Sequence, residues 1–174
     1  MRLLASKASA VLLLVLLATG LCGSRARAGE FALVVTGEVK SELKLTLAEV
    51  EGMTNSTVTV TEREGRSSKY EGVLFHEILR RAGVPLGEGL RGDALRLCVL
   101  VKAADGYQAV FSLAELDPTL VERRVLLAFR REGKELDAEA GPLRLVIPDE
   151  KRHSRWVRRV IELEVIRVGG PAKQ

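Results

Sequence analysis

Short apolar segments alternate with turn-forming residues from residue 29 to the end of the 174-residue chain. Strict alternation over 94–103 predicts a half-buried strand, and the β-branched run at 57–61 predicts another. The continuous apolar run at 125–129 is typical of a strand buried on both faces. Further strands are predicted at 32–39, 107–111, 143–147 and 160–168. In the alternating segments we expect one buried face formed by Leu95, Leu97, Val99 and Val101, and another by Ile161, Leu163 and Val165.

Two capping boxes predict the starts of short helices. Thr46 with Glu49, and Ser112 with Glu115, have the spacing at which each side chain bonds the backbone N–H of the other. A longer helix is predicted over 74–82, where apolar residues recur at helical spacing. With about seven strands, two or three short helices and no helix after every strand, the pattern indicates an α+β fold. It would be a mixed sheet or a distorted barrel.

The first residues of the chain have the layout of a targeting segment. A positively charged start precedes an apolar run at 8–21, which is shorter than a membrane span requires. The Ala-Arg-Ala sequence at 26–28 is typical of a signal cleavage site, so we expect a signal peptide at 1–28 and a single domain at 29–174. The alternative is an uncleaved N-terminal anchor. After cleavage we expect no stable membrane span and a periplasmic or secreted location.

Charge and cysteine content exclude several classes of protein. The formal net charge of +4 comes entirely from four bases within the first 28 residues, so the predicted mature chain is neutral. A neutral domain is a poor candidate for a general nucleic-acid binder. Two cysteines exclude a disulfide scaffold and any four-thiolate metal site. The two histidines, His76 and His153, are far apart and give no metal signature.

Four motifs follow one another along the second part of the chain. They are an aromatic-x-Gly-Val stretch at 70–74, an Asp-Gly-Tyr hairpin at 105–107, a Gly-Pro-x-Arg-Leu-Val-x-Pro strand at 141–148 and a basic turn at 155–158. Together they make residues 32–168 resemble the oxidoreductase molybdopterin-binding domain, which has the sulfite oxidase fold. The resemblance implies a domain that cradles a molybdenum–pterin cofactor and performs two-electron oxidation or reduction.

The resemblance also implies a cysteine ligand to molybdenum, at the end of the strand before the aromatic-x-Gly-Val stretch. No cysteine lies between Cys22 and Cys98, and Thr61 stands at the matching position. A neutral hydroxyl is a poor substitute for a soft thiolate. The chain is also short for a complete catalytic domain of this type, and its start lacks the twin arginines of folded export. We therefore expect no cofactor, with molybdopterin as the alternative if the family activity is retained.

Two other segments supply candidate binding residues. The densest basic cluster lies at 151–159, and the resemblance places this turn near the pterin phosphate, so Arg155 and Arg158 are candidate ligands for phosphate or carboxylate. The alternative is a solvated turn that pairs with neighbouring acids. Asp105 and Tyr107 lie in a hairpin that the family uses near its cleft, although Asp-Gly also suits any tight turn.

These observations predict an exported binding module for a small anionic ligand or a protein partner such as a periplasmic redox protein. The alternative is a molybdopterin-dependent oxidoreductase with an unusual set of metal ligands, so the sequence leaves open whether the chain is an enzyme. A third reading is an accessory protein that docks on a true oxidoreductase. No nucleic-acid partner is expected.

Overall fold

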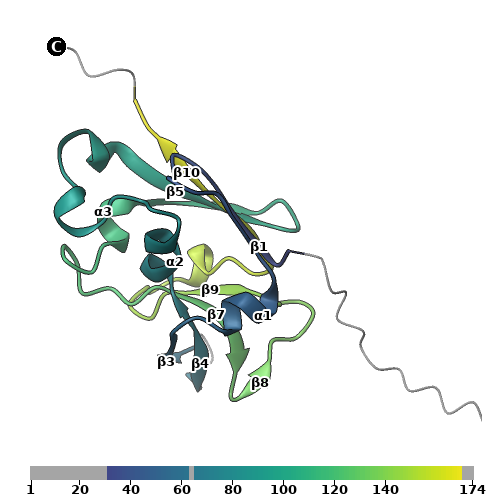
Figure 1. Cartoon of the computed structure of the whole chain (residues 1–174). Coiled ribbons are helices and arrows are strands. Elements are labelled where there is room, and N and C mark those ends of the chain that lie inside the picture. Colours follow the sequence, from purple (N-terminus) through teal and green to yellow (C-terminus); the bar gives the residue numbers. More distant parts are fainter. Residues whose placement is uncertain (1–30, 63–64, 170–174) are drawn as a thin grey trace, which may run out of the picture.

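The computed structural model describes residues 31–62 and 65–169, which form two five-stranded sheets with short helices between and beside them (Figure 1). The predicted signal peptide at 1–28 lies outside the described residues. The α-helices are α1 (Leu47–Glu51), α2 (Phe75–Arg81) and α3 (Leu113–Leu116). The 3-10 turns are η1 (Gly87–Gly89), η2 (Gly92–Arg96) and η3 (His153–Arg155). Within the described part of the chain, every helix is too short or too polar to cross a membrane.

The first sheet joins strands from both ends of the chain in the order β2-β1-β10-β5-β6. Its strands are β1 (Leu33–Gly37), β2 (Leu43–Leu45), β5 (Leu97–Ala103), β6 (Gln108–Ser112) and β10 (Val160–Arg167). Strand β1 runs parallel to β10, and all the other pairs are antiparallel. The sheet is therefore mixed, as the sequence predicts.

The second sheet is antiparallel and carries the hairpins that matter for the site. Its strands are β3 (Asn55–Thr61), β4 (Ser67–Leu74), β7 (Leu126–Arg131), β8 (Lys134–Glu135) and β9 (Arg144–Val146). The order is β3-β4-β7-β8, and β9 also pairs with β7. Tyr70 of β4 stands directly opposite Arg131 of β7, and Ala128 of β7 opposite Arg144 of β9.

The predicted α+β class is confirmed, in the form of two sheets without a closed barrel. The described residues form ten strands where about seven were predicted, because β2, β4 and β8 were not predicted as strands. Strands β2 and β8 have only three and two residues, too few for an alternating pattern. Strand β4 is longer, but its inward positions include Ser68 and Gly72, so its sequence shows no apolar alternation.

Two residues that were predicted to lie on buried faces are exposed. Leu95 belongs to η2 and is 51% exposed, so the strand begins only at Leu97. Ile161 lies at a bulge in β10 and is exposed, while Val160 beside it is buried. A bulge shifts the two-residue alternation by one position, which a regular pattern does not reveal.

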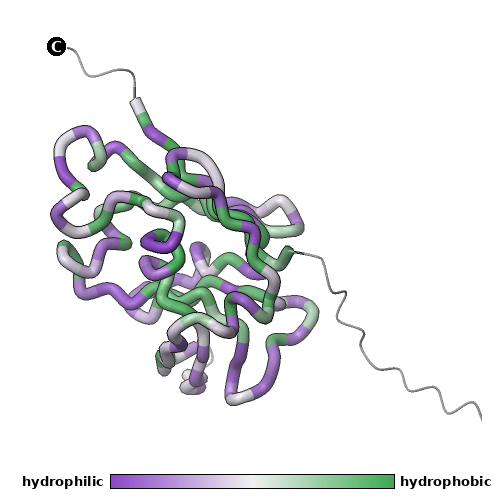
Figure 2. The backbone as a smooth tube through the Cα atoms, in the orientation of Figure 1, coloured by the Kyte–Doolittle hydropathy of each residue, from purple (hydrophilic) through white to green (hydrophobic). Residues whose placement is uncertain are grey.

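The core lies between the two sheets and holds the large aromatic side chains Tyr70, Phe75, Phe111 and Phe129, all at most 2% exposed. Hydrophobic positions follow the strands, whereas the connecting loops are largely hydrophilic (Figure 2). Gly72 permits the close approach of β4 to β7, because a Cβ there would lie 2.2 Å from the Leu127 carbonyl oxygen. This contact explains the glycine of the aromatic-x-Gly-Val stretch.

Both predicted capping boxes are confirmed. The Thr46 hydroxyl accepts the N–H of Glu49 at the start of α1, and the Glu49 carboxylate accepts the N–H of Thr46. Ser112 and Glu115 make the same reciprocal bonds at the start of α3.

Candidate functional site

A cavity of about 470 Å³ is formed beside the second sheet by the β3–β4 hairpin, the end of β7, β9, the loop before β9 and the turn around η3. Its lining is dominated by charged side chains. The arginines are Arg66, Arg131, Arg144 and Arg158. The carboxylates are Glu62, Asp137 and Glu139. With Ala140, His153 and Trp156 completing the wall, the cavity is a polar site for a small charged molecule.

Arg144 lines the cavity without forming an ion pair with any described carboxylate. Its Nη1 donates one hydrogen bond, to the Tyr70 hydroxyl at 3.1 Å, and its buried Nε has no partner. No carboxylate of the described residues lies within ion-pair distance of it. The guanidinium packs 5.6 Å from the ring centres of both Tyr70 and Trp156. Aromatic faces stabilise a cation but leave its N–H groups available, so Arg144 offers spare donors to a ligand.

A second cluster satisfies the Glu62 carboxylate. The Tyr70 hydroxyl donates to Oε1 of Glu62 at 2.7 Å, and Nη2 of Arg131 donates to Oε2 at 2.9 Å. The same nitrogen of Arg131 donates to the Ser68 hydroxyl at 3.0 Å. Strand pairing creates the cluster, since Tyr70 and Arg131 stand opposite each other and Glu62 directly follows β3.

These contacts move two pKa values in opposite directions. Burial raises the pKa of Tyr70 to about 12, and the hydrogen bond to Glu62 adds to the increase. For Glu62, burial acts to raise the pKa, but the Tyr70 hydrogen bond and the charges of Arg131 and Arg144 outweigh it, and the pKa lies below its usual value. The phenol therefore keeps its proton, and the carboxylate stays ionised, at neutral pH.

Trp156 forms part of the cavity wall and packs against Arg144. Its indole N–H donates to the Ile147 carbonyl at 3.1 Å, and its ring meets the Tyr70 ring edge-on at 6.3 Å. His153 stacks on the indole with ring centres 3.7 Å apart. Because the indole is 3% exposed and held on several sides, it presents a rigid surface to the guanidinium.

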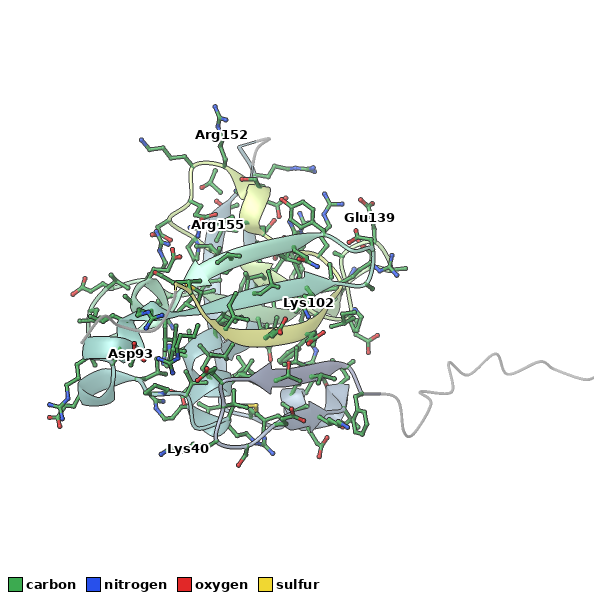
Figure 3. All side chains as sticks on the ribbon, turned by 90° about the horizontal axis from the view of Figure 1, so that it is seen from above. Lys40, Asp93, Lys102, Glu139, Arg152 and Arg155 are labelled. Carbon is green, nitrogen blue, oxygen red and sulfur yellow. The ribbon has the colours of Figure 1, made fainter. Side chains whose placement is uncertain are left out.

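The two arginines predicted from the basic turn have different surroundings. Arg158 lines the cavity and forms an ion pair with Glu139. Arg155 is not among the lining residues: its guanidinium bonds Glu150 and Glu115 and lies 4.6 Å from the ring centre of Phe111. In Figure 3, Arg155 lies well away from Glu139, and Arg152 projects outward from the same turn.

The other predicted site residues also lie outside the lining of the cavity. The Asp105 carboxylate accepts the N–H of Tyr107 at 3.0 Å, which is the bond of a tight turn. The Tyr107 hydroxyl donates to the Ser154 carbonyl at 2.6 Å and ties the hairpin to the basic turn. Thr61 is exposed at the end of β3, and it is the next residue, Glu62, that reaches the cavity.

Glu62, Tyr70, Arg131 and Arg144 were not among the site residues predicted from the sequence. Arg144 had a recognisable signal, because an arginine stands between the apolar residues Leu143 and Leu145 of a predicted strand. A charged residue at such a position needs a partner or a ligand. For the other three no local signal existed, since strand pairing alone brings them together.

The described residues contain no group of three His, Cys, Asp or Glu side chains placed to hold a metal. Cys98 is half-buried on β5 of the first sheet and does not line the cavity. Burial, with a contribution from Glu115, raises the pKa of its thiol. It is therefore a poor thiolate donor in its present position.

Comparison with known proteins agrees with the fold. The family model described as the oxidoreductase molybdopterin binding domain matches residues 22–168. No curated protein matches the chain. Among solved structures, the sulfane dehydrogenase SoxCD from Paracoccus pantotrophus is similar, with a TM-score of 0.60 and 20% identity over 76% of this chain. The match spans 37% of the SoxCD chain. The chain belongs to the oxidoreductase molybdopterin-binding domain family, with a sulfite-oxidase-like fold.

Proposed function

We propose that this domain binds a small oxyanion in the cavity around Arg144 and has no molybdenum chemistry of its own. The observation that carries the proposal is the Arg144 guanidinium, which has a buried Nε without a partner and a single hydrogen bond to a neutral hydroxyl. A buried donor without an acceptor is costly. A carboxylate, sulfate or phosphate bound beside Arg144 would accept from its free N–H groups in the bidentate manner that arginine favours.

The donor set fits an anionic group better than it fits a molybdenum centre. The family resemblance implies a soft thiolate ligand, and Cys98 lies on the other sheet. Among the described residues at the end of β3, the side-chain donors are the Thr61 hydroxyl and the Glu62 carboxylate. Both are hard oxygen donors, and Glu62 is already bonded to Arg131 and Tyr70. The residues present thus suit the anionic part of such a cofactor or a free oxyanion, and they do not suit thiolate ligation.

The cavity also has a suitable size and wall. A volume of about 470 Å³ lies within the range of small-molecule sites. Trp156 and Tyr70 hold Arg144 from two sides, so little conformational entropy is lost when a ligand binds. We further propose that the site works outside the cytoplasm, on the basis of the signal-like segment at 1–28. A periplasmic redox protein would then be its protein partner.

The second candidate function is that of a molybdopterin-dependent oxidoreductase with an unusual set of ligands. Family membership favours it, as does the similarity to a structure whose name is that of a dehydrogenase. The two candidates differ in metal content, since only the enzyme requires molybdenum and pterin.

The experiment is a calorimetric titration of the purified protein with sulfate, phosphate and acetate at constant ionic strength. Arg144→Gln should weaken binding about tenfold or more, because it removes a charged hydrogen-bond donor from the cavity. Arg152→Gln is the matched control, because it removes the same charge from an exposed position on the basic turn. Equal affinities in the wild type and Arg144→Gln would refute the proposal.

A further inference from the structure

Glu62 occupies the cavity much as a bound carboxylate would. Its two oxygens accept from the Tyr70 hydroxyl and the Arg131 guanidinium, at 2.7 and 2.9 Å. Its backbone is fixed at the end of the hairpin, where its N–H donates to the Arg66 carbonyl at 2.8 Å. The carboxylate is 20% exposed, so water screens its charge only in part. The chain itself therefore supplies one anion to this basic cavity.

The charges of the cavity lining offset one another in part. Among the described residues, four arginines and three carboxylates line the cavity. Arg131 is engaged by Glu62, and Arg158 by Glu139. Arg144 has no carboxylate partner among the described residues, and it is close enough to Glu62 and Tyr70 to affect the pKa of each. Arg144 is thus a positive charge of the lining that no ion pair with a described residue neutralises.

We propose that Glu62 makes the cavity selective for singly charged oxyanions, such as the carboxylate of a small organic acid, over doubly charged ones such as sulfate. This inference rests on the proposed function and names its ligand class. A monoanion at Arg144 pairs with the charge of its guanidinium. A dianion at the same place leaves an unpaired negative charge close to the Glu62 carboxylate, and like charges in a partly desolvated site repel strongly.

The test compares acetate and sulfate, titrated separately into the full chain by calorimetry at constant ionic strength. The wild type should bind acetate more tightly than sulfate. Glu62→Gln, which keeps the shape of the side chain and removes its charge, should raise the affinity for sulfate relative to acetate about tenfold. Glu62→Asp keeps the charge and should keep the preference for acetate.

Glu135→Gln is the matched control, since it also removes a carboxylate charge, but from an exposed position on β8 outside the lining of the cavity. Solvent screens a charge at such a position, so the preference should change by less than about twofold. Tighter binding of sulfate than of acetate by the wild type would overturn the inference, even if Glu62→Gln does not fold. So would an unchanged preference in Glu62→Gln. If neither ion binds to the wild type or to Glu62→Gln, the proposed function itself fails; if both bind through Arg144 without the preference, only this inference fails.

Discussion

The Tyr70 hydroxyl donates its single proton to Oε1 of Glu62 at 2.7 Å, so it has no proton left to donate to a second acceptor. The hydroxyl oxygen then has a lone pair left, which accepts the Nη1 bond of Arg144 at 3.1 Å. Tyr70 thereby links a carboxylate that is fully engaged to an arginine that is not. This difference leaves Arg144 with hydrogen-bond donors for a ligand.

Removal of the Glu62 charge should make Tyr70 more acidic. Burial raises the pKa of Tyr70 to about 12, and the hydrogen bond and charge of Glu62 add to that increase. In Glu62→Gln the negative charge is gone, so the phenolate becomes less unfavourable and the pKa falls. Absorbance of the phenolate after rapid pH jumps measures it, in a Tyr107→Phe background that leaves Tyr70 as the one tyrosine. An unchanged or higher Tyr70 pKa in Glu62→Gln would show that the charge of Glu62 does not raise the pKa of Tyr70.

Glu62 should also make stability depend on pH in the acid range. Its pKa in the folded protein lies below the usual 4.5, so between the two values the unfolded chain binds more protons. The stabilisation is therefore fully present above 4.5 and is lost as the pH falls through the lowered value. Urea unfolding from pH 7 to 3 should show that the advantage of the wild type over Glu62→Gln shrinks with acidification. A constant difference across this range would contradict the prediction.

Arg155 should matter for stability and not for anion binding. Its guanidinium is engaged by Glu150 and Glu115, and none of its contacts reaches the cavity. Arg155→Gln should cost about 1 kcal/mol in the free energy of unfolding, because a partly exposed ion-pair network contributes little. The dissociation constants for acetate and sulfate should stay within about twofold of the wild type. If Arg155→Gln lost as much anion binding as Arg144→Gln, the anion site would have to lie at the basic turn.

Gly72→Ala should be strongly destabilising. The added Cβ would lie 2.2 Å from the Leu127 carbonyl oxygen and 2.6 Å from the Ala128 Cα, so β4 and β7 would have to separate. We expect a loss of about 3 kcal/mol in the free energy of unfolding, measured with urea. Gly89→Ala is the control, because its nearest neighbour, the Pro85 Cβ, is 3.5 Å away. Similar effects of the two substitutions would refute the close approach of the strands.

Local sequence signals predicted the local structure well. The capping boxes at Thr46 and Ser112 start helices as expected, and the apolar run at 125–129 is a buried segment that lies largely in β7. Where the prediction failed, the cause is tertiary. Leu95 belongs to a 3-10 turn, and Ile161 lies at a bulge that exists only because β10 pairs with β5.

The site was harder to predict than the fold. Arg158 is the one predicted site residue that lines the cavity. The cluster of Glu62, Tyr70 and Arg131 depends on the register of three strands, and no spacing along the chain encodes that register. Arg144 belongs to the Gly-Pro-x-Arg-Leu-Val-x-Pro motif. That its Nε has no hydrogen-bond acceptor can be seen only when its neighbours in space are known.

The central claim, that the domain binds an oxyanion without molybdenum chemistry, is tested most directly by the metal content of the native protein. The measurement is elemental analysis for molybdenum, together with pterin fluorescence, on protein purified from its own host. The account predicts molybdenum far below one atom per chain and no pterin. Near-stoichiometric molybdenum with pterin would contradict it, and the oxygen donors Thr61 and Glu62 would then have to be examined as its ligands.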